Sequence, residues 1–310
     1  MNFLPRSDSS ISFRDYAYGL FARALPICME GFSPKHLKFQ EPDYIAGIVN
    51  NLPKYVNTSS PYMLSIGGCF IHKSPLVSFL NDCGEHNCCE LGDLLVLYRD
   101  RSGKEDRYNS VLFQFKRSEY DIIDPVQYYL YSRWPRFNFG RKIYQRKEQY
   151  DVTPKSKSGG GLYNFIHTCD RLRFTVAEPH PCVVDGGFDI RQGMRFEDYL
   201  ANFVTWKEGR EISSYKKHPE EKKQDEWSHL IWDVVEKTFD ATFKCNSIGI
   251  NKCKRGFVER MNFLLEQKVL ECNVDAFAAR FGAEDFDKAC SILLINRDAQ
   301  TAISPSVRLG

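Results

Sequence analysis

Two strongly apolar runs separated by a polar connection constrain the fold of this chain more than any other feature. The runs LGDLLVLY (91–98) and NSVLFQFK (109–116) are rich in strand-forming residues, whereas the connection RDRSGKEDRY (99–108) is polar. This pattern predicts an antiparallel β-hairpin. A turn at Lys104 and Glu105 would place residue 93 opposite 116 and residue 95 opposite 114.

The predicted hairpin brings three polar residues together at its open end. Asp93 lies at the start of the first run, and Gln114 and Lys116 lie at the end of the second. Because side chains alternate along a strand, Gln114 and Lys116 should share one face, with Phe113 and Phe115 on the other. We therefore expect Asp93, Gln114 and Lys116 to converge.

These residue types suit metal-dependent hydrolysis of a phosphodiester bond. A hard divalent cation takes oxygen ligands, which the Asp93 carboxylate, the Gln114 amide and the Phe115 carbonyl could supply. Lys116 could then orient or deprotonate the attacking water. The sequence thus predicts a Mg²⁺ site, in which Mn²⁺ could substitute, with Asp93, Gln114 and Phe115 as its ligands.

The sequence G-D-L-L-V-L, a hairpin and V-L-F-Q-F-K together resemble the PD-(D/E)xK nuclease superfamily, which includes many restriction and repair nucleases. Gln114 departs from the usual acid, but a Q-x-K variant occurs in branches resembling Mrr-type restriction enzymes. The resemblance covers roughly residues 40 to 140. It implies an α/β fold with a restriction-endonuclease-like central mixed sheet flanked by helices.

The same resemblance implies further site residues. The superfamily places an acid on a helix before the first strand; Glu30 and Glu41 are candidates, and Glu90, close to Asp93 in sequence, is the favoured one. Q-x-x-x-Y, here Gln127 and Tyr131, follows the lysine strand in several exonuclease-like members. Because residues four apart share a helix face, these two side chains should approach the catalytic centre together.

Helices are expected before and after these strands in the sequence. Apolar spacing predicts helices over residues 13–29 and 43–55, the second with Asp43 as its N-cap. An apolar strand is expected over residues 62–71. Asp124 and Pro125 form an N-cap and N1 pair for a helix that ends near Pro135.

A basic stretch with interleaved aromatic residues follows that helix. Basic side chains neutralise phosphates, and exposed aromatic rings can stack on bases, although the same rings could instead pack into the core. The sequence predicts a nucleic-acid surface whose basic residues are Arg133, Arg136, Arg141, Lys142, Arg146 and Lys147.

The low-complexity segment KSKSGGG marks the main internal boundary. It divides the chain into a nuclease-like core (1–154), a flexible linker or loop (155–161) and a helix-rich C-terminal portion (162–310). This last portion would serve regulation, assembly or substrate clamping. Its helix near Trp227 carries an apolar stripe that could be core or could bind a second copy or another protein.

Composition indicates an ordinary globular chain. The N-terminus lacks a signal-peptide pattern, and nowhere do about 18 consecutive apolar residues occur, so we expect a cytoplasmic protein without membrane contact. The odd number of cysteines, 11, argues against a disulfide scaffold. Cys83, His86, Cys88 and Cys89 have zinc-ligand chemistry but lack a paired C-x-x-C arrangement.

The expected function is therefore Mg²⁺-dependent hydrolysis of DNA, with RNA as an open alternative and prokaryotic defence against foreign DNA as a setting. The rival hypothesis is a nuclease fold without catalysis, which binds nucleic acid or a partner protein. Gln114 and the unresolved upstream acid motivate that rival. Net charge, only +2, does not decide between them.

Overall fold

A mixed β-sheet forms the centre of the computed structural model, which describes residues 11–30, 39–56, 62–71, 75–117, 123–139, 149–152, 160–168, 172–179, 193–215, 225–245, 257–267, 269–272 and 289–298. Across the sheet the strands follow the order β11 (Val269–Cys272), β1 (Leu64–Ile71), β12 (Ser291–Arg297), β4 (Leu94–Asp100), β5 (Arg107–Arg117), β7 (Gly161–His167), β8 (Arg173–Ala177) and β9 (Met194–Arg195). Strand β10 (Arg210–Ile212) pairs with the first part of β5.

Parallel and antiparallel pairs alternate through much of this sheet. The pairs β1–β11, β12–β4 and β5–β7 are parallel, whereas β1–β12, β4–β5, β7–β8 and β8–β9 are antiparallel. The expected α/β class, with a mixed central sheet flanked by helices, is confirmed at this level.

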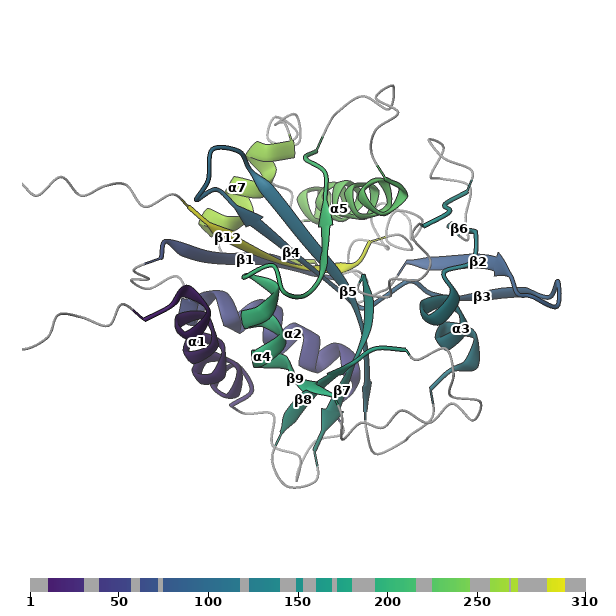
Figure 1. The fold of residues 1–310 in the computed structure, drawn as a ribbon, viewed down its shortest axis with the longest axis horizontal. Helices are drawn as coiled ribbons and strands as arrows, with labels where there is room; N and C mark the ends of the chain where they lie inside the picture. The colour runs from purple at the N-terminus through teal and green to yellow at the C-terminus, as the bar shows by residue number, and fades with distance from the viewer. Residues whose placement is uncertain are drawn as a thin grey trace, which may run out of the picture.

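Helices cover both faces of the sheet (Figure 1). One face carries α1 (Phe13–Cys28), α2 (Glu41–Val56) and α4 (Phe196–Phe203). The other carries α5 (Glu226–Cys245) and α7 (Phe257–Gln267). Strand residues alternate between the two cores: Phe113 and Phe115 pack with the first group of helices, and Leu112 packs with the second.

A second, smaller sheet lies beside the main one (Figure 1). Its order is β3 (His86–Glu90), β2 (Leu76–Leu80) and β6 (Phe137–Phe139), all antiparallel. Helix α3 (Pro125–Arg133) lies next to β3. Because β3 is followed directly by β4, the small sheet and the main sheet meet at residues 91–93.

Helix starts follow local capping chemistry, with one correction. Asp124 accepts a hydrogen bond of 2.8 Å from the Val126 N–H, as expected for the N-cap of α3. Helix α2 begins at Glu41, not after Asp43, so Asp43 is not its N-cap. The Asp43 carboxylate instead reaches back and accepts the Gln40 N–H at 2.7 Å, the second half of a capping box.

The β4–β5 hairpin forms as predicted, but its register differs by two residues. Asp100 pairs with Arg107, so the turn centre lies between Gly103 and Lys104, and Leu94 pairs with Phe113. The Asp100 carboxylate accepts hydrogen bonds from the N–H and the hydroxyl of Ser102. These bonds stabilise a turn that lies nearer the N-terminus than expected. A shift of two preserves strand alternation, so the side chains keep their expected faces.

The C-terminal portion, expected to be helix-rich, also supplies the strands β7 to β12. Strand β12 lies between β1 and β4, and β7 pairs with β5, so a division at residues 155–161 runs through one sheet. The apolar stripe of α5 lies in the core and offers no free surface to a partner; its fully buried residues are Trp227, Leu230, Ile231, Val234, Val235 and Phe239. No helix within the described ranges is long and apolar enough to cross a membrane.

Gly67 in β1 permits close packing of α7 on the sheet. A Cβ at this position would lie 2.6 Å from the backbone oxygen of Leu264 in α7. We expect Gly67→Ala to lower the free energy of unfolding by about 1–3 kcal/mol through overpacking. Gly19→Ala, on α1 with only the end of Arg23 within 4 Å, should raise it by up to about 1 kcal/mol.

Urea unfolding of both variants, followed by circular dichroism, measures these changes. A Gly67→Ala protein as stable as the wild type would contradict the close approach of α7 to β1.

Candidate functional site

A cavity of about 300 Å³ lies at one end of the main sheet, where β1 and β5 end and β4 and β12 begin. The N-terminus of α2 closes one side. Its polar lining residues are Gln40, Glu41, Glu90, Asp93, Gln114, Lys116 and Ser291. The structure thus brings Glu90, Asp93, Gln114 and Lys116 together at one opening.

Asp93 is fixed to β5 by hydrogen bonds from both its backbone and its side chain. Its N–H donates to the Phe113 carbonyl at 2.8 Å, and its Oδ2 accepts the Phe115 N–H, also at 2.8 Å. The carboxylate therefore lies against the stretch of β5 that carries Gln114. In the observed register Asp93 is level with Gln114, not with Lys116 as expected.

Gln114 carries the most unusual group in the cavity. Its side chain is only 2% exposed, and no hydrogen-bond partner for its Oε1 occurs in the described part of the chain. A buried acceptor without a partner costs about 1–3 kcal/mol, and each such group calls for an explanation. Because Gln114 lines the cavity with Asp93, its amide oxygen is a candidate ligand for a cation.

The upstream acid that the resemblance implies has two candidates in the cavity. Glu41, half-buried in the first turn of α2, also lines the cavity, and its Oε1 accepts the Arg117 N–H at 3.4 Å. Glu90, the favoured candidate, lines it from the end of β3 and is exposed. Glu30 lies in a different cleft, between α1 and β8. Glu41 thus matches the expected helical position better than either.

Gln127 and Tyr131 hydrogen-bond to the backbone beside the site and do not line the cavity. Gln127 Nε2 donates to the Glu90 carbonyl at 3.3 Å, and the Tyr131 hydroxyl donates to the Leu91 carbonyl at 2.8 Å. Both side chains are buried, and their hydrogen bonds position the backbone that leads to Asp93. A Cβ at Gly92 would lie 2.8 Å from the Tyr131 hydroxyl, so this support needs glycine.

Two buried groups that could ionise, the Cys290 thiol and the Tyr131 hydroxyl, lie close enough to Asp93 to be affected by its charge. Burial, followed by the Asp93 charge, raises the pKa of the Cys290 thiol well above its ordinary value. Burial likewise raises the pKa of Tyr131. Both groups therefore stay neutral.

A metal ion in this cavity would need neutral oxygen ligands. Within the described ranges, no three His, Cys, Asp or Glu side chains are placed to share one ion. The oxygen-bearing groups at the cavity are the Asp93 carboxylate, the Gln114 amide and backbone carbonyls, and Phe115, whose carbonyl was a predicted ligand, also lines the cavity. The buried acceptor of Gln114 fits such an ion.

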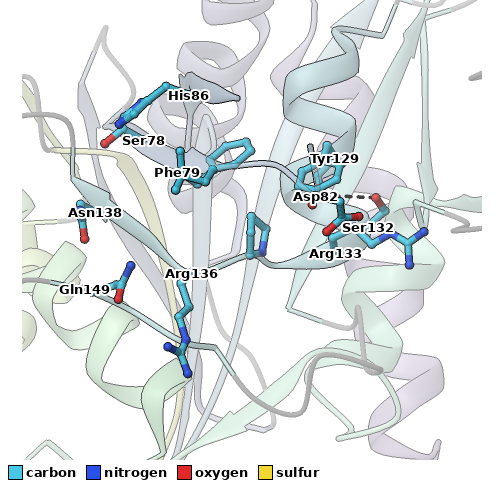
Figure 2. Close-up of a pocket in the computed structure, with 12 residues that line it drawn as sticks. Ser78, Phe79, Asp82, His86, Tyr129, Ser132, Arg133, Arg136, Asn138 and Gln149 are labelled. Carbon is cyan, nitrogen blue, oxygen red and sulfur yellow. Dashed lines mark hydrogen bonds between the residues drawn. The ribbon is translucent and has the colours of Figure 1, made fainter. Parts of the chain in front are cut away.

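A second and larger cleft, of about 860 Å³, lies between α3 and the small sheet (Figure 2). Of the predicted nucleic-acid-binding residues, Arg133 and Arg136 line this cleft, and Arg136 is bonded to Asp151 at 2.7 Å. The rest of that group lies outside the described residues, namely Arg141, Lys142, Arg146 and Lys147.

Aromatic residues of the same stretch pack into the core, as the alternative interpretation held. Trp134, Phe137 and Tyr150 are each at most 2% exposed. Their rings contact one another and not solvent: Phe137 and Tyr150 stack with centroids 5.6 Å apart. These rings are therefore closed to nucleic-acid bases.

The cysteine–histidine group on the β2–β3 hairpin does not converge on one point. Cys88 is exposed, whereas neighbouring Cys89 is buried on the opposite face of the strand. Burial raises the pKa of Cys89 to about 12, so its thiol is protonated near neutral pH. This arrangement disfavours a shared zinc ion.

Ser291 is a cavity residue that sequence reasoning missed. It is 1% exposed, and its hydroxyl bridges to Ile71 by donating to the carbonyl at 3.0 Å and accepting the N–H at 3.1 Å. No local motif signals it, because the pairing of β1 with β12 is what brings it to the cavity.

Comparison with protein families, with curated proteins and with solved structures found no match to this chain. The functional argument therefore rests on the geometry of the cavity and on the sequence resemblance.

Gln114→Glu should tighten Mg²⁺ or Mn²⁺ binding in the protein without substrate, because a carboxylate attracts a cation more strongly than an amide does. Calorimetric titration of both ions into wild type and variant measures the effect, with circular dichroism to verify folding. Equal affinities in two folded proteins would show that residue 114 does not face the ion.

Proposed function

We propose that this chain is a Mg²⁺-dependent nuclease that hydrolyses phosphodiester bonds of DNA in the Asp93–Gln114–Lys116 cavity. The observation that carries the proposal is the buried Gln114 Oε1 without a hydrogen-bond partner, beside the Asp93 carboxylate and Lys116. The Asp93 carboxylate, an amide oxygen and a lysine at the end of a hairpin, with Glu41 and Glu90 at the same cavity, are groups that such hydrolysis can use. The PD-(D/E)xK resemblance independently supports the same residues.

Each residue has a distinct role in the proposed reaction. Asp93 and Gln114 hold the cation, and Glu41 or Glu90 adds negative charge at the rim. A bound Mg²⁺ would neutralise charge that develops on the phosphate. Lys116, half-buried at the cavity, orients the attacking water and takes part in its deprotonation.

DNA is the proposed substrate because the sequence resembles a superfamily that includes many restriction and repair nucleases, and Arg133 at the end of α3 offers a cation in the second cleft. RNA carries the same phosphate chemistry and is the alternative that an assay must separate. The setting in prokaryotic defence rests on the sequence resemblance alone.

One observation favours the rival function, a nuclease fold that binds nucleic acid without cutting it. The Phe115 N–H occupies one oxygen of Asp93, and no group of three metal-type side chains occurs among the described residues. In that protein the cavity would bind a phosphate through Lys116 without cleavage. Catalysis by purified protein separates the two functions.

Lys116→Ala should abolish cleavage and leave folding and DNA affinity largely unchanged, because the lysine acts on the chemical step. Lys104→Ala, at the exposed turn of the same hairpin, is the matched control and should cleave at the wild-type rate. The assay uses circular DNA, linear DNA and RNA, each with Mg²⁺ and with EDTA.

Cleavage that needs Mg²⁺ and Lys116 supports the nuclease. Wild-type turnover by a folded Lys116→Ala protein would remove the lysine from the mechanism. Binding without cleavage of any of the three substrates would favour the rival function.

A further inference from the structure

The cleft between α3 and the small sheet offers both charge and an aromatic surface (Figure 2). Helix α3 contributes Tyr129, Ser132 and Arg133, and β2 and β3 contribute Phe79 and His86. The Tyr129 ring is stacked on the Phe79 ring, with centroids 5.8 Å apart and planes 9° apart. The half-buried Tyr129 therefore presents a rigidly supported aromatic group to the cleft.

Arg133 is the available cation of this cleft. Its side chain is exposed, and within the described ranges no hydrogen bond or ion pair engages the guanidinium. Arg136 is already paired with Asp151, and Asp82 lies beside Tyr129, whose pKa is raised by burial and by that carboxylate. Arg133 is therefore the cation of this cleft that an entering anionic group can pair with, although Asp82 also lines the cleft.

The cleft and the cavity are connected by two elements. His86 lines the cleft at one end of β3, and Glu90 lines the cavity at the other end. Four steps along a strand span about 13 Å, so a single nucleic-acid strand could reach both the cleft and the cavity. Helix α3 likewise holds the Glu90 backbone through Gln127 and lines the cleft through Arg133.

The geometry points to the cleft as a binding site for unpaired nucleotides of the same strand that is cut in the cavity. This assignment rests on the proposed nuclease function. Arg133 binds a phosphate, and Tyr129 contacts a base.

Size favours unpaired nucleotides over a duplex. The cleft, about 860 Å³, is in the range of sites that enclose a small organic molecule, about 300–1,000 Å³. A duplex hides the faces of its bases and could present only backbone to Tyr129. The preferred substrate is therefore single-stranded DNA or a duplex with an unpaired end.

The test measures fluorescence anisotropy of a labelled 12-nucleotide single strand and of its blunt duplex in EDTA. Wild type should bind the single strand more tightly. Arg133→Gln should weaken that binding several-fold and lower the log–log salt slope by about 0.7. Tyr129→Ser should weaken it at least about fivefold. Arg173→Gln, which changes an exposed arginine of the separate cleft between α1 and β8, should have no effect.

Three results would overturn the assignment: equal binding of single strand and duplex, identical behaviour of the Arg133 and Arg173 variants, or a mononucleotide that binds as tightly as the oligonucleotide. Cleavage by the same preparations in Mg²⁺ tests the nuclease separately. Cleavage with binding independent of Arg133 overturns only the cleft. Binding that depends on Arg133 without any cleavage overturns the nuclease and supports the cleft.

Discussion

The candidate site depends on the attachment of Asp93 to β5. Two hydrogen bonds of 2.8 Å attach the connection between β3 and β4 to β5. One runs from the Asp93 N–H to the Phe113 carbonyl, and the other from the Phe115 N–H to the Asp93 carboxylate. Because Gln114 lies between those two partners, the two bonds set the distance between carboxylate and amide. The Tyr131 hydroxyl holds the same segment from the opposite side through Leu91.

The cavity carries a cost that the rest of the fold offsets. An unpaired buried oxygen at Gln114 opposes folding, whereas the layers on both sides are extensively packed. Functional sites often retain such local conflicts, because a group satisfied within the protein is less available to a ligand. We propose that a cation satisfies the Gln114 oxygen. The close contact between Tyr131 and Gly92 keeps the neighbouring backbone in place.

Local patterns in the sequence were sufficient for the hairpin faces and for the Asp124 cap, because both depend on neighbouring residues. The hairpin register was wrong by two, since the Asp100 carboxylate closes the turn through a side-chain contact that propensities do not reveal. Strand β12 was missed because its place between β1 and β4 depends on partners far along the chain. Glu41 reaches the same cavity as Glu90 although it is far from Asp93 in sequence, because closeness in sequence does not determine closeness in space.

The most direct test of the central claim is thermal unfolding of wild type and Gln114→Met, each in EDTA and in excess Mn²⁺. In EDTA, Gln114→Met should be more stable than the wild type by about 1–3 kcal/mol, because the substitution removes an unsatisfied buried oxygen. Mn²⁺ should stabilise only the wild type, since a ligand that binds the folded state raises its stability. A variant that is destabilised in EDTA, or that gains as much from Mn²⁺ as the wild type does, would contradict the assignment of Gln114 as a metal ligand.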